Sequence, residues 1–212
     1  MNSDAPTTVD DWQTLSNDLL QGLVHALNNR LSALGALMEL ARLRDETVDP
    51  LSELPTEVAQ LQALTGLFAL LPERRADAEA LELSAAIDDA VRLHEHHLRL
   101  RAERCEVRYE GAPPPVRAPR WALVRTLVML VHAAKRSGGA AGERGGGPMI
   151  VRTDESMVSV CVSTGASPSR DLLDAGERAG GEFTREDDLL VFRLPTLAEL
   201  RRRERRARDE RT

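Results

Sequence analysis

The chain has 212 residues, a formal net charge of −6, 42% apolar residues and only 3% aromatic residues. That length suits one ordinary domain or two small ones, and the core must be built mainly from Leu, Val and Ala. The acidic balance argues against a nucleic-acid-binding protein, the polar N-terminus is unlike a secretory signal, and no apolar run approaches the roughly 20 residues of a membrane span.

The cysteines Cys105 and Cys161 do not form a closely spaced redox or metal-binding pair. We therefore expect a cytoplasmic, reducing setting in which both thiols are free and buried. A disulfide between them is the less favoured alternative.

Residues 12–75 predict a helical hairpin. Residues 1–11 are expected to be a disordered leader with a capping signal at Asp10 or Asp11. A long helix over 12–44 and a second helix over 54–71 are joined by a tight connection at 45–50. The first helix has an apolar stripe at helical spacing, formed by Leu20, Leu23, Val24, Leu27, Leu31, Leu34, Met38 and Ala41. One hairpin cannot cover so long a stripe, so we expect a homodimer that forms a four-helix bundle.

Residues 80–195 predict an α/β sandwich in which helices cover one face of a mixed sheet, giving an α+β fold overall. In chain order we expect a helix over 81–104, a strand over 105–110, a Pro-rich loop over 111–119, a helix over 121–137, a Gly-rich connector over 137–147, strands over 149–153 and 157–163, a helix over 169–179, and strands over 182–184 and 189–194. Residues 196–212 form an Arg-rich helix or tail. A solvated surface is the favoured interpretation, and contact with an acidic partner, membrane or nucleic acid is the alternative.

The most informative segment lies on the first helix around His25. At 100° per residue, His25 lies about 160° from Leu27 and so faces away from the hairpin core. Asn29 follows one turn later on the same face. The small residues expected to share that face are Gly22, Ser32, Ala33 and Ala36. An imidazole exposed among small side chains suits a nucleophile that enters another protein's pocket, and a neutral ring nitrogen can attack phosphorus near neutral pH. The alternative is a surface histidine without a role, and spacing alone does not decide between them.

The stretch His25-Ala26-Leu27-Asn28-Asn29-Arg30-Leu31 resembles the phosphoacceptor box of bacterial sensor histidine kinases. In order and spacing, the second half resembles the ATP-binding domain of the same family. The asparagine box is matched at 129–134 and the first glycine box at 163–167. The resemblance covers residues 15–195 and implies a dimeric bundle followed by a histidine-kinase-ATPase-like sandwich.

Departures from the family pattern imply that ATP use has been lost. The acidic residue that follows the histidine in the family is Ala26 here. The stretch at 129–134 has no Asn to hold Mg²⁺, and the stretch at 163–167 has no Asp to bind adenine. The segment 168–179 leaves no room for the second glycine box and the ATP lid.

What remains resembles the dimeric histidine phosphotransferases that look like degenerate histidine kinases. The resemblance implies that His25 exchanges phosphoryl groups with receiver-domain aspartates of response regulators and that Asn29 assists. The residues implied in receiver binding are Gly22, Asn28, Ser32, Ala33 and Ala36. No cofactor is expected on this chain, because the partner receiver holds the Mg²⁺, and a hybrid histidine kinase is a candidate donor. The alternatives are a non-catalytic scaffold that binds response regulators and a histidine kinase or phosphatase with residual activity.

A second group of histidines, His94, His96 and His97, lies near the end of the helix expected over 81–104. His94 and His97 are three residues apart, as helical metal ligands are. No further ligand completes a set at a fitting spacing, so no metal site is expected and a solvated helix surface is the favoured interpretation.

Overall fold

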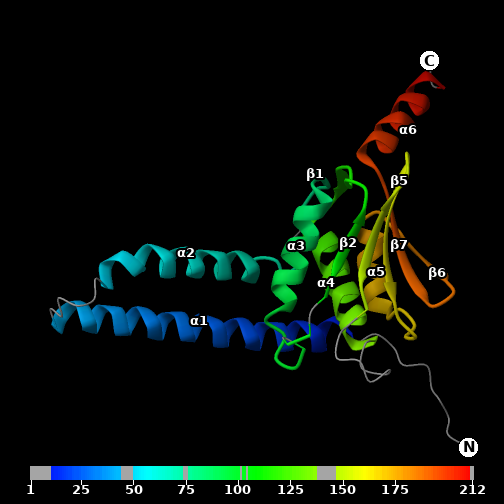
Figure 1. Ribbon diagram of the computed structural model, residues 1–212. Coiled ribbons are helices and arrows are strands. Elements are labelled where there is room, and N and C mark those ends of the chain that lie inside the picture. Colours follow the sequence, from blue (N-terminus) through cyan, green and yellow to red (C-terminus); the bar gives the residue numbers. More distant parts are fainter. Residues whose placement is uncertain are drawn as a thin grey trace, which may run out of the picture.

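The computed structural model describes residues 11–43, 50–73, 76–100, 102–103, 105–137 and 147–210. The predicted leader at 1–10, most of the connection at 45–50 and most of the Gly-rich connector lie outside these residues. Figure 1 shows two parts, a long helical arm and an α/β domain.

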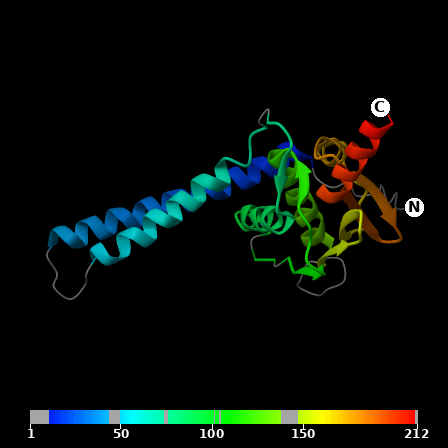
Figure 2. The same cartoon turned by 90° about the horizontal axis from the view of Figure 1, so that it is seen from above.

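The arm consists of α1 (Trp12–Leu43) and α2 (Pro50–Phe68), which run side by side in both views (Figure 1, Figure 2). Asp11 caps α1, because its Oδ1 accepts a hydrogen bond from the backbone N–H of Thr14 at 2.7 Å, as the sequence predicts. α2 begins earlier than expected, so Pro55 lies inside the helix and not in its first turn. Arg30 of α1 pairs with Glu57 of α2 at 3.3 Å.

α2 covers only part of the apolar stripe predicted on α1. Several of its large side chains remain exposed, namely Leu20 at 43%, Val24 at 42%, Leu31 at 52% and Met38 at 55%. They recur at intervals of four, seven and seven residues, which places them on one side of α1. Val58 on α2 is also 45% exposed. The arm of a single chain therefore carries an uncovered apolar surface.

The first three turns of α1 pack on the α/β domain, in a cluster that also includes Leu64 of α2. Leu15, Leu19 and Leu23 are at most 1% exposed and belong to the domain's core cluster. Trp12 lies under the guanidinium of Arg125, 4.8 Å from its ring centre, and its backbone N–H donates to Asp171 at 2.8 Å. The sequence placed this whole helix in the hairpin, but its N-terminal part is shared with the domain.

The domain is built around a five-stranded sheet in the order β2-β4-β5-β7-β6. Its strands are β2 (Val107–Glu110), β4 (Met149–Thr153), β5 (Met157–Ser163), β6 (Glu182–Glu186) and β7 (Leu189–Pro195). Only β2 and β4 are parallel, so the predicted mixed sheet is confirmed.

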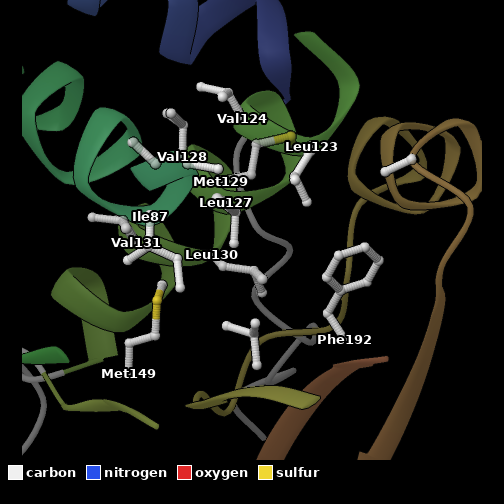
Figure 3. Packing of buried hydrophobic residues seen from close by; sticks show 14 of the residues in the cluster. Ile87, Leu123, Val124, Leu127, Val128, Met129, Leu130, Val131, Met149 and Phe192 are labelled. Atoms are coloured by element: carbon white, nitrogen blue, oxygen red, sulfur yellow. The ribbon is translucent and has the colours of Figure 1, made fainter. Parts of the chain in front are cut away.

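The helices of the domain are α3 (Leu83–His94), α4 (Arg120–Ser137) and α5 (Arg170–Arg178). α4 packs on β5, α5 on β6 and α3 on α4, which gives a helical layer against the sheet (Figure 1, Figure 2). Figure 3 shows the interior between them, where side chains of α4 meet Ile87 of α3 and Phe192 of β7.

Two predictions for this half are wrong. The helix over 81–104 ends at His94, and the Pro-rich loop contains a strand, β3 (Val116–Ala118), which pairs antiparallel with β1 (Glu79–Leu81). Val116 and Ala118 are fully buried, so burial stabilises this short pair.

The chain ends in α6 (Leu197–Asp209), which projects from the domain in Figure 1 and has no buried residue. Thr196 caps it by accepting a hydrogen bond from the backbone N–H of Glu199 at 3.1 Å. Arg203 pairs with Glu199 at 2.8 Å and Arg117 with Glu204 at 3.2 Å. Among the helices the structure describes, none combines the length and apolar content needed to cross a membrane.

Candidate functional site

His25 and Asn29 lie next to each other on the exposed surface of α1, as the helical spacing predicts. The amide nitrogen of Asn29 is 3.4 Å from Nε2 of His25, at the long end of the hydrogen-bond range. The Asn29 amide can donate to Nε2 when the proton of the neutral ring is on Nδ1, and in that tautomer Nε2 carries the lone pair of a nucleophile.

The surroundings of His25 differ from the prediction at one position. Asn28, Ser32 and Ala36 are exposed and Ala33 is half-buried, so these four remain accessible on α1. Gly22 is buried instead, because the turn that follows α3 packs on it. A Cβ at Gly22 would lie 1.6 Å from the backbone oxygen of His96. Gly22 therefore allows the close approach of two backbones and does not belong to an exposed surface.

Ala26, the residue after the histidine, is half-buried and packs against the domain's core cluster. A carboxylate at this position would lie against apolar side chains, where burial disfavours its charged form. The described neighbours of His25 on α1 thus supply an amide and no carboxylate next to the ring.

The stretch matched to the asparagine box lies inside the protein. Met129 is fully buried and lies among the apolar side chains of α4 and its neighbours (Figure 3), and Ala133 is 3% exposed. Neither side chain has an oxygen that could bind Mg²⁺, and the close packing leaves no space at Met129.

The stretch matched to the first glycine box follows β5 and is held by an arginine. The guanidinium of Arg185 donates to the backbone oxygens of Thr164 at 3.2 Å and Ala166 at 3.3 Å. The hydroxyl of Thr164 accepts from the backbone N–H of Ala166 at 3.1 Å, so Thr164 and Ala166 are both held by hydrogen bonds within the protein. β5 ends at Ser163 and α5 begins at Arg170, which leaves a connection of six residues.

His94 and His97 are not on a solvated surface, which corrects the prediction for them. They are 0% and 3% exposed and pack with His132 of α4, which is 2% exposed. The three ring centres are 5.2–5.3 Å apart, and Nε2 of His94 lies 3.1 Å from Nδ1 of His132. We call these three residues the histidine cluster.

The described residues contain no group of three His, Cys, Asp or Glu side chains arranged to hold a metal ion. Proximity of the rings alone therefore does not make the histidine cluster a metal centre. The sequence reasoning missed His132 as a member, although it lies in the stretch compared with the asparagine box. The only available signal was a polar residue in an otherwise apolar helical run.

The histidine cluster makes stability depend on pH. Burial, reinforced by the charges of Lys135, His132 and His97, lowers the pKa of His94 from its ordinary 6.5 to about 2. Between these values the unfolded chain binds a proton that the folded chain does not, so the free energy of unfolding falls as pH falls. We expect His94 to cost about 1 kcal/mol between pH 6.5 and 5.5, because the imidazole of the unfolded chain is only half-protonated at pH 6.5.

Urea unfolding at both pH values, for the wild type and for His94→Gln, measures this cost. Subtracting the change in the free energy of unfolding of His94→Gln from that of the wild type cancels the contributions of the other titrating groups, which both proteins share. Equal pH slopes in the two proteins would contradict the assignment of the slope to His94.

No protein-family profile matches the chain, and no curated protein does. Among solved structures, it is similar to a bacterial phosphotransferase, with 16% identity, a TM-score of 0.42, and coverage of 89% of this chain and 99% of that one. It is similar to the catalytic domain of histidine kinase ThkA, with 18% identity, a TM-score of 0.42, and coverage of 57% and 97%. For ThkA in complex with the response regulator TrrA, the identity is 16%, the TM-score 0.44, and the coverage 88% and 64%. At these identities and TM-scores the likeness assigns no family to the chain.

Proposed function

We propose that the protein carries phosphoryl groups on His25 and exchanges them with receiver-domain aspartates of response regulators, without using ATP. The observation that carries the proposal is the exposed His25–Asn29 pair on a long helix, with Nε2 directed at the Asn29 amide. An exposed nucleophile that has no carboxylate beside it on its helix is suited to a partner that brings the electrophile, the acid groups and the metal ion.

The transfer forms one bond and breaks one. The Nε2 lone pair of His25 attacks the phosphorus of an aspartyl phosphate, the P–O bond to the aspartate breaks, and the aspartate leaves as a carboxylate. The phosphorylated ring can lose its Nδ1 proton to solvent. The amide of Asn29, adjacent to Nε2, can donate to a phosphoryl oxygen while the phosphorus passes. The reverse sequence returns the group to a second receiver.

The absence of ATP use in this proposal is supported by three local features. The histidine kinase family has a Mg²⁺ ligand in the stretch where this chain has the buried Met129 and Ala133. The family has an adenine-binding Asp in the turn whose backbone oxygens are here bound by the guanidinium of Arg185. The short connection between β5 and α5 leaves no length for a lid over a nucleotide. A kinase function would require a nucleotide site built from other groups.

The test uses purified receivers carrying ³²P on their aspartates, with Mg²⁺. The protein should gain label while a receiver loses it, and the label should be labile to acid and stable to base, as phosphohistidine is. Absence of label with every receiver of the same organism would rule out the transfer role. Titration with ATP and Mg²⁺ should give no saturable signal, and saturation would reopen the kinase alternative.

Ala26 favours a second candidate, a non-catalytic scaffold that binds response regulators, because histidine kinases carry an acidic residue there. The scaffold predicts that receivers bind equally to the wild type and to His25→Gln, with no label on either. A phosphatase acting through Asn29 predicts instead that receiver phosphate is lost faster with the wild type than with Asn29→Ala.

We also propose that two copies associate through the arm. The exposed apolar side chains Leu20, Val24, Leu31 and Met38 of α1 follow a coiled-coil spacing. Leu31 lies six residues after His25 and so about 120° around the helix, which keeps the acceptor outside this surface. A second arm would bury the apolar stripe and complete a four-helix bundle.

Replacing Leu31 with Arg is expected to dissociate this dimer. The arginine would place an unpaired charge in the apolar contact between the two arms, so the dimer dissociation constant should rise at least about tenfold. Light scattering during size-exclusion chromatography should show twice the chain mass for the wild type and the monomer mass for Leu31→Arg. The matched control is Leu173→Arg on α5, where a leucine of the domain is 43% exposed. Equal masses for wild type and Leu31→Arg would contradict the arm as the interface.

A further inference from the structure

The turn that follows α3 lies beside His25 on the acceptor helix, and we call its residues 95–100 the α3 turn. It packs on α1 so closely that a Cβ on Gly22 would lie 1.6 Å from the backbone oxygen of His96. Figure 1 shows the chain that leaves α3 reaching α1. Gly22 precedes His25 by three residues, which is about 4.5 Å along the helix axis and about 60° around it. The α/β domain therefore reaches the surface next to the acceptor.

The α3 turn is held in place on both sides of Leu98. The ring of His97 is 3% exposed, and its Nε2 lies 3.5 Å from Oδ2 of Asp18 on α1. Nδ1 of the same ring accepts hydrogen bonds from the backbone N–H groups of Arg99 and Leu100, both at 3.2 Å. Leu98, between these anchored residues, is nevertheless 40% exposed. A leucine on a fixed backbone loses little conformational freedom when a partner covers it.

Leu98 is flanked by charged side chains of both signs, because Glu95 and Arg99 of the same turn are also exposed. An apolar contact surrounded by polar groups is the usual composition of a protein interface. A single exposed leucine is ordinary on a protein surface, so it is the position beside His25 that gives Leu98 significance.

A receiver that brings phosphorus to Nε2 of His25 must cover the surface around that side chain. Specific interfaces bury roughly 800 Å² per partner, which corresponds to a disc of about 16 Å radius. The backbone of His96 packs on Gly22, and the two residues from His96 to Leu98 span at most about 7 Å. Leu98 therefore falls within an interface of this size centred on His25.

We propose that the α3 turn is part of the surface on which a receiver docks, and that Leu98 contacts the receiver. The inference rests on the proposed exchange with receivers and extends their docking surface from α1 to the α/β domain. Gly22, which the sequence placed on that surface, is covered by the turn, so a receiver meets Leu98 there in its place. The domain then has a function that requires no nucleotide, because it presents a recognition surface beside the acceptor.

The experiment measures receiver binding separately from transfer. Calorimetry with each receiver of the same organism uses the His25→Gln protein, in which His25 cannot accept a phosphoryl group. Adding Leu98→Arg should raise the Kd at least about tenfold, because a charged side chain replaces an apolar contact. In the protein that retains His25, Leu98→Arg should raise the receiver concentration for half-maximal transfer by a similar factor, with little change in the maximal rate.

The matched control is Leu173→Arg on α5, where a leucine that is 43% exposed lies outside the proposed surface. It should leave the Kd unchanged. The milder Leu98→Ala should weaken binding about threefold, through the loss of apolar contact alone. Because Leu98 is exposed, neither of its variants should lower the thermal unfolding midpoint.

An unchanged Kd and an unchanged half-saturating concentration in Leu98→Arg would overturn the docking role of the α3 turn, even if the wild type is labelled. A lower maximal rate with an unchanged Kd would also overturn it and would assign the turn to the positioning of α1. Binding that depends on Leu98, with no label on the wild type, would support the docking surface and refute the transfer. Neither binding nor label with any receiver would refute both.

Discussion

Replacing His25 with Gln is expected to abolish phosphoryl transfer to the protein completely. Nε2 of His25 is the nitrogen directed at the Asn29 amide, and the glutamine side chain has no nucleophilic nitrogen to replace it. The side chain is exposed on α1, so its loss should leave the fold and the thermal unfolding midpoint unchanged. The measurement is the label retained after incubation with a phosphorylated receiver.

The matched control is His96→Gln, which removes another histidine close to α1 in space. The backbone of His96 packs on Gly22, but nothing in the proposed transfer uses its ring. His96→Gln should retain full labelling. Equal labelling of the wild type and His25→Gln would show that another residue accepts the group, and loss of label in both variants would indicate a general change in this region.

The exposure of His25 and Asn29 could be predicted because it depends on one helix alone. Once Leu27 is placed toward α2, the angular spacing of an α-helix fixes which residues lie opposite. The same reasoning failed at Gly22, Leu15 and Leu19. Their burial depends on the α/β domain packing on the first turns of α1, and no local periodicity in α1 reports that contact.

The elements that were missed depend on residues far apart in the chain. β1 and β3 are three residues each and pair across the whole of α3, so neither shows a strand pattern by itself. In the histidine cluster, His94 and His132 come together across 38 positions because α3 packs on α4. Taken alone, the end of α3 has the polar composition of a solvated surface, which is why the prediction there was wrong.

Replacing Gly22 with Ala is expected to destabilise the protein by about 3 kcal/mol, because it forces apart two packed backbones. The new Cβ would lie 1.6 Å from the backbone oxygen of His96 and 2.7 Å from its carbonyl carbon. A backbone carbonyl has no rotamer with which to move away. Relief therefore requires α1 to shift away from the turn that follows α3, which pulls Leu19 and Leu23 out of the core.

Gly35 of the same helix provides a control with the opposite sign, because a Cβ there meets no atom within 4 Å. Gly35→Ala should raise the free energy of unfolding by up to about 1 kcal/mol, through the higher helix propensity of alanine. Urea unfolding followed by tryptophan fluorescence measures both variants, and Trp12 under Arg125 reports release of the first turn of α1. If Gly22→Ala were as stable as Gly35→Ala, α1 would not be packed on the α/β domain. In that case the domain would be free to move relative to His25, as a domain that delivers ATP to the acceptor would have to be. A loss of stability confined to Gly22→Ala instead means that the acceptor and the domain form one body, to which a partner must bring the phosphoryl group.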